Sequence, residues 1–210
     1  MKREGWRRFG LESGESIADH MYRMSIMTMM APPSLASQLD MPHCTQMALV
    51  HDMAESLVGD LTPVDGIDKE EKHRREAEAM DYLCETLLGN VYNDKYQDIA
   101  TNDAISHKLT ADDTATTTTM NTKSNRIGPY IRSLWQEYED STTSESLFVH
   151  DVDKIELLLQ MVEYERAHEG RLDLAEFTRV GDRVVLEEMK GWAGEVLEDR
   201  RRFWHQMRKQ

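Results

Sequence analysis

The sequence predicts an all-α protein folded as a compact helical bundle. Only five prolines interrupt its 210 residues, and its fourteen methionines suit the adaptable core of a helical protein. Few segments alternate apolar and polar residues between turn signals, so a substantial sheet is not expected. We expect a single domain over residues 1–210, which is long enough to bury a hydrophobic core.

Apolar residues recur at helical spacing in several long segments. Ser16 is a candidate N-cap for the first of these helices, and Gly59 is expected to end the second. The tail from about 172 to 204 is expected to hold one or two more helices, jointed around Gly181 or Gly191. The predicted helices lie at about 16–30, 45–58, 69–88, 127–139 and 144–167, with a further short one within 92–108.

One stretch departs from this helical pattern. Residues 109–126 are rich in threonine, with four in a row at 116–119, and they have neither a helical period nor much material for a core. We interpret this stretch as an exposed polar loop inserted into the domain. A short exposed strand is the alternative.

Charge and cysteine content exclude several classes of function. With 25 Lys and Arg against 39 Asp and Glu, the net charge is −14, which argues against binding a nucleic acid polymer but allows a local cleft for one phosphate. Two cysteines cannot supply a four-thiolate metal site. No run approaches the roughly 18 apolar residues of a membrane span, and the N-terminus lacks the apolar core of a signal peptide. We therefore expect a cytoplasmic protein without a membrane partner.

A His-Asp pair stands inside an apolar predicted helix, at His51 and Asp52. Burying an ionised carboxylate is costly unless it is paired or bound to a cation. Glu55 follows His51 by four residues, so both side chains point from one helix face, one turn apart. A buried His-Asp hydrogen bond beside a surface glutamate explains these three residues equally well.

Two other segments favour a metal site. His20 lies in the first predicted helix, and the acidic residues Asp151 and Asp153 lie near the start of the 144–167 helix. Helical bundles build metal sites from inward side chains on facing helices. His20, His51, Asp52 and one of Asp151 or Asp153 would offer mixed nitrogen and oxygen ligands to a divalent cation such as Mn, Co, Mg, Fe or Zn.

The order His, His-Asp, Asp resembles that of the HD-domain metal-dependent phosphohydrolases. The flanking segments 15–24, 47–55, 59–63 and 69–76 resemble those of the eukaryotic HD-domain-containing 5′-deoxynucleotidases. The resemblance covers about residues 5–108 and 127–177. The insertion at 109–126 departs from the family pattern, and the C-terminal tail is only loosely similar.

This resemblance implies a metal site and two catalytic acids. The metal ligands would be His20, His51, Asp52 and Asp153, because the family's last aspartate directly precedes an apolar run, as Asp153 does here. Glu55 matches the carboxylate that assists the attacking water. Asp60 matches a second active-site acid, or else it caps its loop.

The resemblance also implies contacts to a nucleotide. Trp6, fourteen residues before His20, matches a tryptophan beside the sugar, although it could equally be a staple for the N-terminus. Gly5 stands where some bacterial members carry the arginine that holds phosphate. The remaining candidates for that role are Arg7, Arg8 and Arg23.

The implied function is hydrolysis of deoxyribonucleoside 5′-monophosphates to deoxynucleoside and phosphate, by a homodimer. One alternative is hydrolysis of cyclic or polyphosphate nucleotides on the same fold. Another is a noncatalytic helical binding module stabilised by the metal, against which the presence of both Glu55 and Asp60 argues.

Overall fold

The computed structural model describes residues 1–62, 65–87 and 127–209. Within these ranges the chain forms helices and one isolated antiparallel bridge, between Lys2 and Ser16, and no strand. The all-α prediction is therefore confirmed. The threonine-rich insertion at 109–126 and the short helix expected within 92–108 lie outside the described residues.

The first three helices are α1 (Glu4–Arg7), α2 (Ile17–Thr28) and α3 (Pro33–Ala36). Ser16 caps α2 as predicted: its hydroxyl accepts a hydrogen bond from the Asp19 amide, and the Asp19 carboxylate accepts one from the Ser16 amide. This reciprocal pair satisfies two of the amides that the first turn of a helix leaves without partners.

The prediction of a single helix at 45–58 is wrong, because the structure has two helices there. Helix α4 (Met41–Val50) begins earlier, where the Asp40 side chain accepts a hydrogen bond from the His43 amide. Helix α5 (Glu55–Val58) follows after a stretch of turns at 51–54. This break places the His-Asp pair at the end of α4 instead of inside a continuous helix. Gly59 ends α5 with a positive φ of 91°, a backbone conformation that other residues rarely adopt.

The remaining helices follow the predicted ranges closely. In the described part of the chain, no helix is both long enough and apolar enough to cross a membrane. The joint in the tail lies at 184–186, just after Gly181, and the last helix continues through Gly191. These helices are α6 (Lys69–Asp81), which continues as the π-helix η2 (Tyr82–Leu87), then α9 (Ile127–Asp140), α10 (Ser144–Ala167), the 3₁₀ segment η3 (Ala175–Arg183) and α11 (Glu187–Met207).

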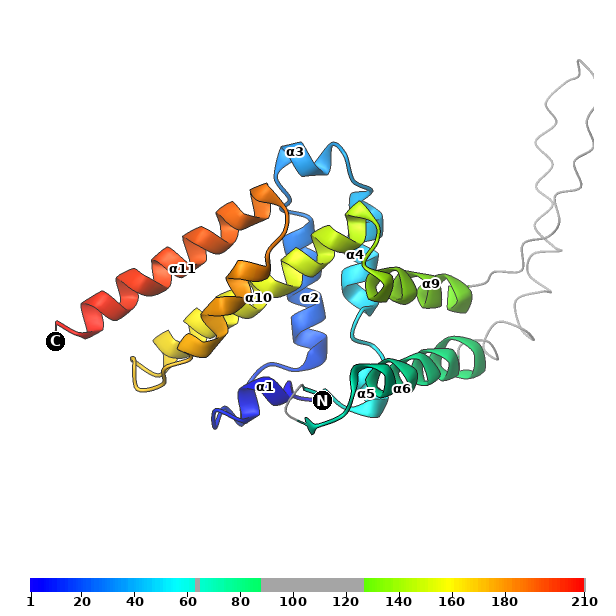
Figure 1. Ribbon diagram of the computed structural model, residues 1–210, viewed down its shortest axis with the longest axis horizontal. Coiled ribbons are helices and arrows are strands. Elements are labelled where there is room, and N and C mark those ends of the chain that lie inside the picture. The colour runs from blue at the N-terminus through cyan, green and yellow to red at the C-terminus, as the bar shows by residue number, and fades with distance from the viewer. Residues whose placement is uncertain (63–64, 88–126, 210) are drawn as a thin grey trace, which may run out of the picture.

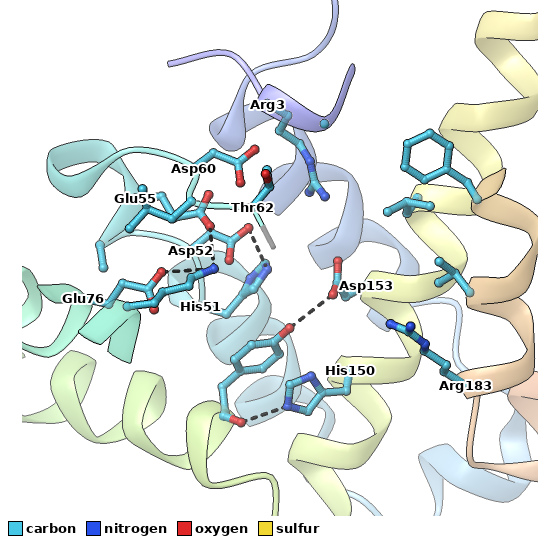
Figure 2. Close-up of a pocket in the computed structure, with 18 of the residues that line it drawn as sticks. Arg3, His51, Asp52, Glu55, Asp60, Thr62, Glu76, His150, Asp153 and Arg183 are labelled. Carbon is cyan, nitrogen blue, oxygen red and sulfur yellow. Dashed lines mark hydrogen bonds and ion pairs between the residues drawn. The ribbon is translucent and has the colours of Figure 1, made fainter. Parts of the chain in front are cut away.

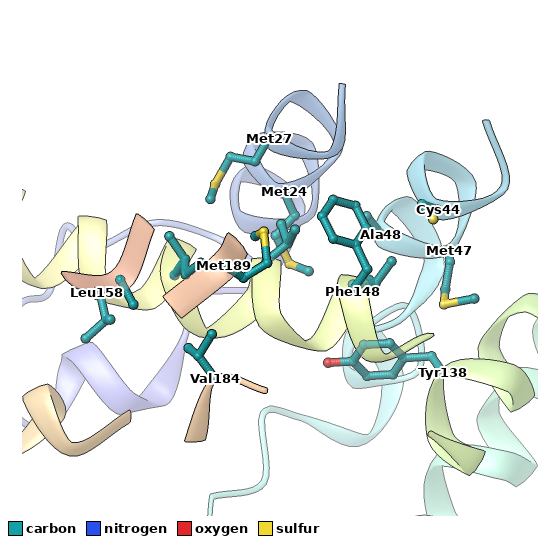
Figure 3. Packing of buried hydrophobic residues seen from close by; sticks show 14 of the residues in the cluster. Met24, Met27, Cys44, Met47, Ala48, Tyr138, Phe148, Leu158, Val184 and Met189 are labelled. Atoms are coloured by element: carbon teal, nitrogen blue, oxygen red, sulfur yellow. The ribbon is translucent and has the colours of Figure 1, made fainter. Parts of the chain in front are cut away.

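Helix α10 is the centre of the packing. It contacts α2, α4, α9, η3 and α11, and Figure 1 shows it crossing the middle of the molecule. Phe148 and Leu158 of α10 are fully buried, and they pack with Met24 of α2 and Met47 of α4 in the main hydrophobic cluster (Figure 3). A smaller cluster joins α6, η2 and α9. The polar residues described next therefore start from helices that a shared core fixes relative to one another.

Candidate active site

Four of the predicted site residues meet where α2, α4 and α10 converge. His20 comes from α2, His51 from the C-cap of α4, and Asp153 from α10; one ligand atom of each lies within 4.8 Å of the others. The Nε2 of His20 lies 3.2 Å from Asp153 Oδ1 and 3.8 Å from Asp52 Oδ2. The Nε2 of His51 lies 3.2 Å from the same Asp52 oxygen.

Each imidazole is held through its other nitrogen. The Nδ1 of His51 lies 2.9 Å from the Ala48 carbonyl oxygen, and the Nδ1 of His20 lies 2.6 Å from Glu156 Oε2. Because a carbonyl and a carboxylate accept hydrogen bonds, Nδ1 of both rings donates a hydrogen bond, and Nε2 is the nitrogen that faces the aspartates. Both Nε2 atoms are buried and have no well-aligned hydrogen-bond partner in the part of the chain that is described.

The charges of these groups suit a cation. Burial opposes ionisation of Asp52, but the adjacent His51 holds the pKa of this carboxyl well below its usual range. His20 similarly lowers the pKa of Asp153 against the effect of burial. With no cation present, burial and the Arg3 charge oppose protonation of His20, yet Asp153 and Glu156 raise its pKa to about 10. Once His20 loses its proton to an incoming cation, two imidazole nitrogens and two ionised carboxylates form a donor set that fits a divalent metal ion.

The structure separates the two aspartates that the sequence could not. Asp151 is fully buried and accepts hydrogen bonds from the amides of Val185 and Leu186, just before α11. It also pairs with Lys154 at 3.0 Å. Asp151 therefore anchors the tail, whereas Asp153 lies beside His20.

Glu55 lines the same pocket from the first turn of α5 and is buried. Burial, followed by the charges of Asp52 and Asp60, raises its pKa to about 9. Lys72 of α6 opposes this rise: its Nζ lies 3.7 Å from Glu55 Oε1 and 3.4 Å from Glu76 Oε1. Figure 2 shows Glu55 beside Asp52 on one wall of the pocket.

Asp60 has both a capping position and a place in the pocket. Its Oδ2 accepts a hydrogen bond of 2.7 Å from the Glu4 amide, which begins α1. It also lines the pocket near Glu55, as Figure 2 shows. The two roles that the sequence left open for Asp60 are thus compatible.

The pocket measures about 940 Å³, which is within the range of ligand sites. It extends from His51, Asp52 and Asp153 past the N-terminal segment to η3. Arg3, which the sequence analysis did not single out, points into it above Asp52 and Asp153 (Figure 2). The Nη1 of Arg3 is buried without a hydrogen-bond partner in the described ranges, and its Nε lies 3.7 Å from Glu15 Oε1.

Trp6 lines the pocket but is almost fully buried, at 2% exposure. Its Nε1 donates a hydrogen bond of 3.3 Å to Glu15 Oε1. Its ring packs against Tyr164 and Phe177, with centroids 5.2 and 4.9 Å away. These contacts make Trp6 a staple for the N-terminal segment, and its place in the pocket wall keeps a sugar contact available.

The three predicted phosphate arginines lie in different places. Arg7 is exposed and pairs with Glu4 at 2.8 Å. Arg23 binds Glu163 and Glu156 and is not among the residues that line the pocket. Arg8 lines the pocket, where it pairs with Asp65 at 2.7 Å.

Other pocket residues were not singled out from the sequence. Tyr138 donates a 3.4 Å hydrogen bond to Asp153 Oδ2, and its ring stacks on His150 with a centroid separation of 3.9 Å. Arg179 and Arg183 of η3 also line the pocket. No local motif marks these residues, because only the packing of α9 and η3 against α10 brings them to the site.

Comparisons with known proteins agree with this fold. A sequence model of the HD domain matches residues 1–100 and 95–192. The 5′-deoxynucleotidase hdd1 of Schizosaccharomyces pombe is 39% identical over 98% of this chain and 86% of its own length. The 5′-deoxynucleotidase YGK1 of Saccharomyces cerevisiae is 36% identical over 99% of this chain and 80% of its own.

Solved structures show the same fold. That of the HD domain-containing protein YGK1 superimposes with a TM-score of 0.60 at 33% identity, covering 90% of this chain and 79% of that one. The PH0347 protein of Pyrococcus horikoshii, 21% identical, shares the fold with a TM-score of 0.61 over 97% of this chain and 92% of its own. From its sequence and its fold, the chain belongs to the HD domain family.

Proposed function

We propose that this protein is a metal-dependent 5′-deoxynucleotidase, which hydrolyses deoxyribonucleoside 5′-monophosphates to the deoxynucleoside and phosphate. The observation that carries the proposal is the pair of buried, unpartnered Nε2 atoms of His20 and His51, facing two aspartates at the end of a ligand-sized pocket. The names of the relatives in the two yeasts support the reaction and the substrate class.

In this proposal His20, His51, Asp52 and Asp153 hold the cation. Nitrogen and oxygen ligands of this kind suit Mn, Co, Mg, Fe or Zn. When bound, such a cation supplies Lewis-acid stabilisation of charge on the phosphoryl group and a water molecule of lowered pKa. Tyr138 steadies Asp153 through its hydroxyl hydrogen bond.

Arg3 is the residue that we propose for the phosphate. Its side chain lines the pocket, and among the described residues its Nη1 has no hydrogen-bond partner, so an anion that enters gains a charge-assisted hydrogen bond. The candidates from sequence are less suited, because Arg7 and Arg23 lie outside the pocket lining and Arg8 is paired with Asp65.

The two remaining acids act on protons. Glu55, at the pocket wall beside Asp52, orients the attacking water and takes its proton, and Lys72 favours the ionised form that this role requires. Asp60 uses Oδ2 to hold the Glu4 amide, so Oδ1 is left to position or protonate the leaving 5′-oxygen. Trp6 packs against the sugar and leaves no partner for a 2′-hydroxyl.

A substrate panel tests this function. We expect phosphate release from deoxyribonucleoside 5′-monophosphates to exceed release from the matching ribonucleotides, cyclic nucleotides and triphosphates, in the presence of an added divalent metal. A preference for cyclic or triphosphate substrates would reject the proposal in favour of another nucleotide hydrolase. A metal-loaded protein that is inactive on the whole panel would indicate a binding module. That the protein is a homodimer stays a prediction of the resemblance. Size-exclusion chromatography with light scattering, which measures the molar mass in solution, tests it.

A further inference from the structure

Behind the proposed metal ligands lies a fully buried carboxylate, Glu156, that the reaction described above does not use. It stands three residues after Asp153 on α10, so both side chains project from one face of the helix, one turn apart. Its Oε2 lies 2.6 Å from the Nδ1 of His20, on the side of the ring opposite Asp153.

The second oxygen of Glu156 is held from α2. Arg23 follows His20 by three residues on that helix, and its Nε lies 2.7 Å from Glu156 Oε1. The outer edge of the Arg23 guanidinium donates two hydrogen bonds, of 2.8 and 3.0 Å, to the exposed Glu163. A chain of charges thus runs from the surface through Arg23 and Glu156 to His20.

This chain constrains the ring of His20 more than packing alone does. The carboxylate of Glu156 accepts a hydrogen bond from Nδ1, which keeps a proton there and leaves Nε2 as the nitrogen that gives up its proton to a cation. Arg23 stops the carboxylate from rotating away. The ring of His51 has no such support from a side chain, because its Nδ1 faces the Ala48 carbonyl of its own helix.

A structural role alone is a weak reason to bury this group. Replacing a buried ion pair by apolar residues of similar size is often neutral or stabilising, and α2 and α10 already pack together, with Met24 and Phe148 in one hydrophobic cluster. A carboxylate hydrogen-bonded to a metal-ligating histidine, in contrast, fixes the tautomer of the ring and raises its basicity.

We infer that Glu156 is a positioning residue for His20, with Arg23 holding Glu156 in place, and that this pair sets the affinity of the site for its cation. The inference rests on the proposed function, since it takes His20 to be a metal ligand. It adds a residue that contacts neither the cation nor the substrate.

The test compares Glu156→Gln with Glu163→Gln. Both changes remove one carboxylate that binds Arg23, but only the first also removes the partner of His20. A glutamine at 156 keeps the size of the side chain, yet its amide group must face a donor on either His20 or Arg23. Isothermal titration of metal-stripped protein with Mn²⁺ should give a Kd about 10- to 100-fold higher for Glu156→Gln than for wild type. Glu163→Gln should bind Mn²⁺ as wild type does.

A second measurement needs no variant. Long-range ¹H–¹⁵N spectra of wild-type protein loaded with diamagnetic Zn²⁺ should show His20 with a proton on Nδ1 and none on Nε2. The proton on Nδ1 should exchange slowly with water, because it lies in a buried hydrogen bond.

The outcomes separate this inference from the proposed function. Wild type that binds no metal would contradict the proposed function itself. Wild type that binds metal, with an unchanged Kd in folded Glu156→Gln or with a rapidly exchanging proton on Nδ1 of His20, would overturn only the positioning role. An equal loss in Glu163→Gln would also overturn it, because that change leaves the contact between Glu156 and His20 in place.

Discussion

Replacing Arg3 by methionine tests the proposed phosphate contact. The side chain lines the pocket and is 16% exposed, and its Nη1 has no hydrogen-bond partner in the described residues, so the guanidinium has a donor left for a phosphate oxygen. A hydrogen bond to a charged group contributes about 1.5–3 kcal/mol, so the loss of one should lower kcat/KM about 10- to 150-fold. The fold should persist, since the main-chain hydrogen bond of 3.2 Å from the Arg3 amide to the Glu15 carbonyl does not need the side chain.

Metal binding separates this effect from damage to the site. Arg3 is a cation close to Asp52 and Asp153, so its removal should leave the affinity for Mn²⁺ unchanged or higher. Steady-state kinetics on dAMP at saturating metal, beside a Mn²⁺ titration, give both quantities. Arg7→Met is the matched control, because Arg7 is exposed and lies outside the pocket lining. Arg3→Met with wild-type kcat/KM, or with weakened Mn²⁺ binding, would refute the reasoning.

Three further predictions concern Glu55 and Trp6. Glu55→Gln should keep the metal and lower kcat by about 10²–10⁴-fold, the range of acid–base assistance; an unchanged kcat at saturating dAMP would remove Glu55 from the mechanism. In the metal-free protein the pKa of Glu55 is raised from 4.5 to about 9, so between these pH values the folded state binds a proton that the unfolded chain has lost. Folding stability therefore falls as pH rises through this window. The Tm of Glu55→Gln minus the Tm of wild type, both measured in EDTA, should therefore increase as the pH rises from 5 to about 8.5. A difference in Tm that does not change with pH would argue against the raised pKa of Glu55. Finally, Trp6→Phe should narrow the ratio of kcat/KM for dAMP over AMP; a ratio that does not change would place the cause of sugar selectivity elsewhere.

Local signals predicted most of the helices, because they act within a few residues. Ser16 begins α2 through its capping box with Asp19, and the pattern over 144–167 matches α10. The break between α4 and α5 was missed because the apolar period continues through residues 51–54. Sequence periodicity reports which face of a segment is buried, and it is blind to a turn that keeps the same residues inside.

The site was predictable where a motif marks it. His20, His51 and Asp52 stand in segments that carry the family motif. The choice of Asp153 over Asp151 needed the resemblance, since both aspartates flank the same apolar stripe. Arg3 and Glu156 escaped detection for a different reason. Glu156 meets His20 across 136 residues of chain, and Arg3 reaches the pocket only because α1 folds back against Asp60. Contacts of this kind depend on the packing of helices, which a single sequence does not reveal.

The most direct test of the account is restoration of activity by metal. Wild-type protein stripped of metal with a chelator should release no phosphate from dAMP. Added Mn²⁺ or Co²⁺ should restore the rate of release in proportion to the amount of metal that the protein binds. His51→Ala should stay folded, bind neither ion at this site and remain inactive at the same metal concentrations. Full activity of the stripped protein, or of His51→Ala without bound metal, would contradict the account.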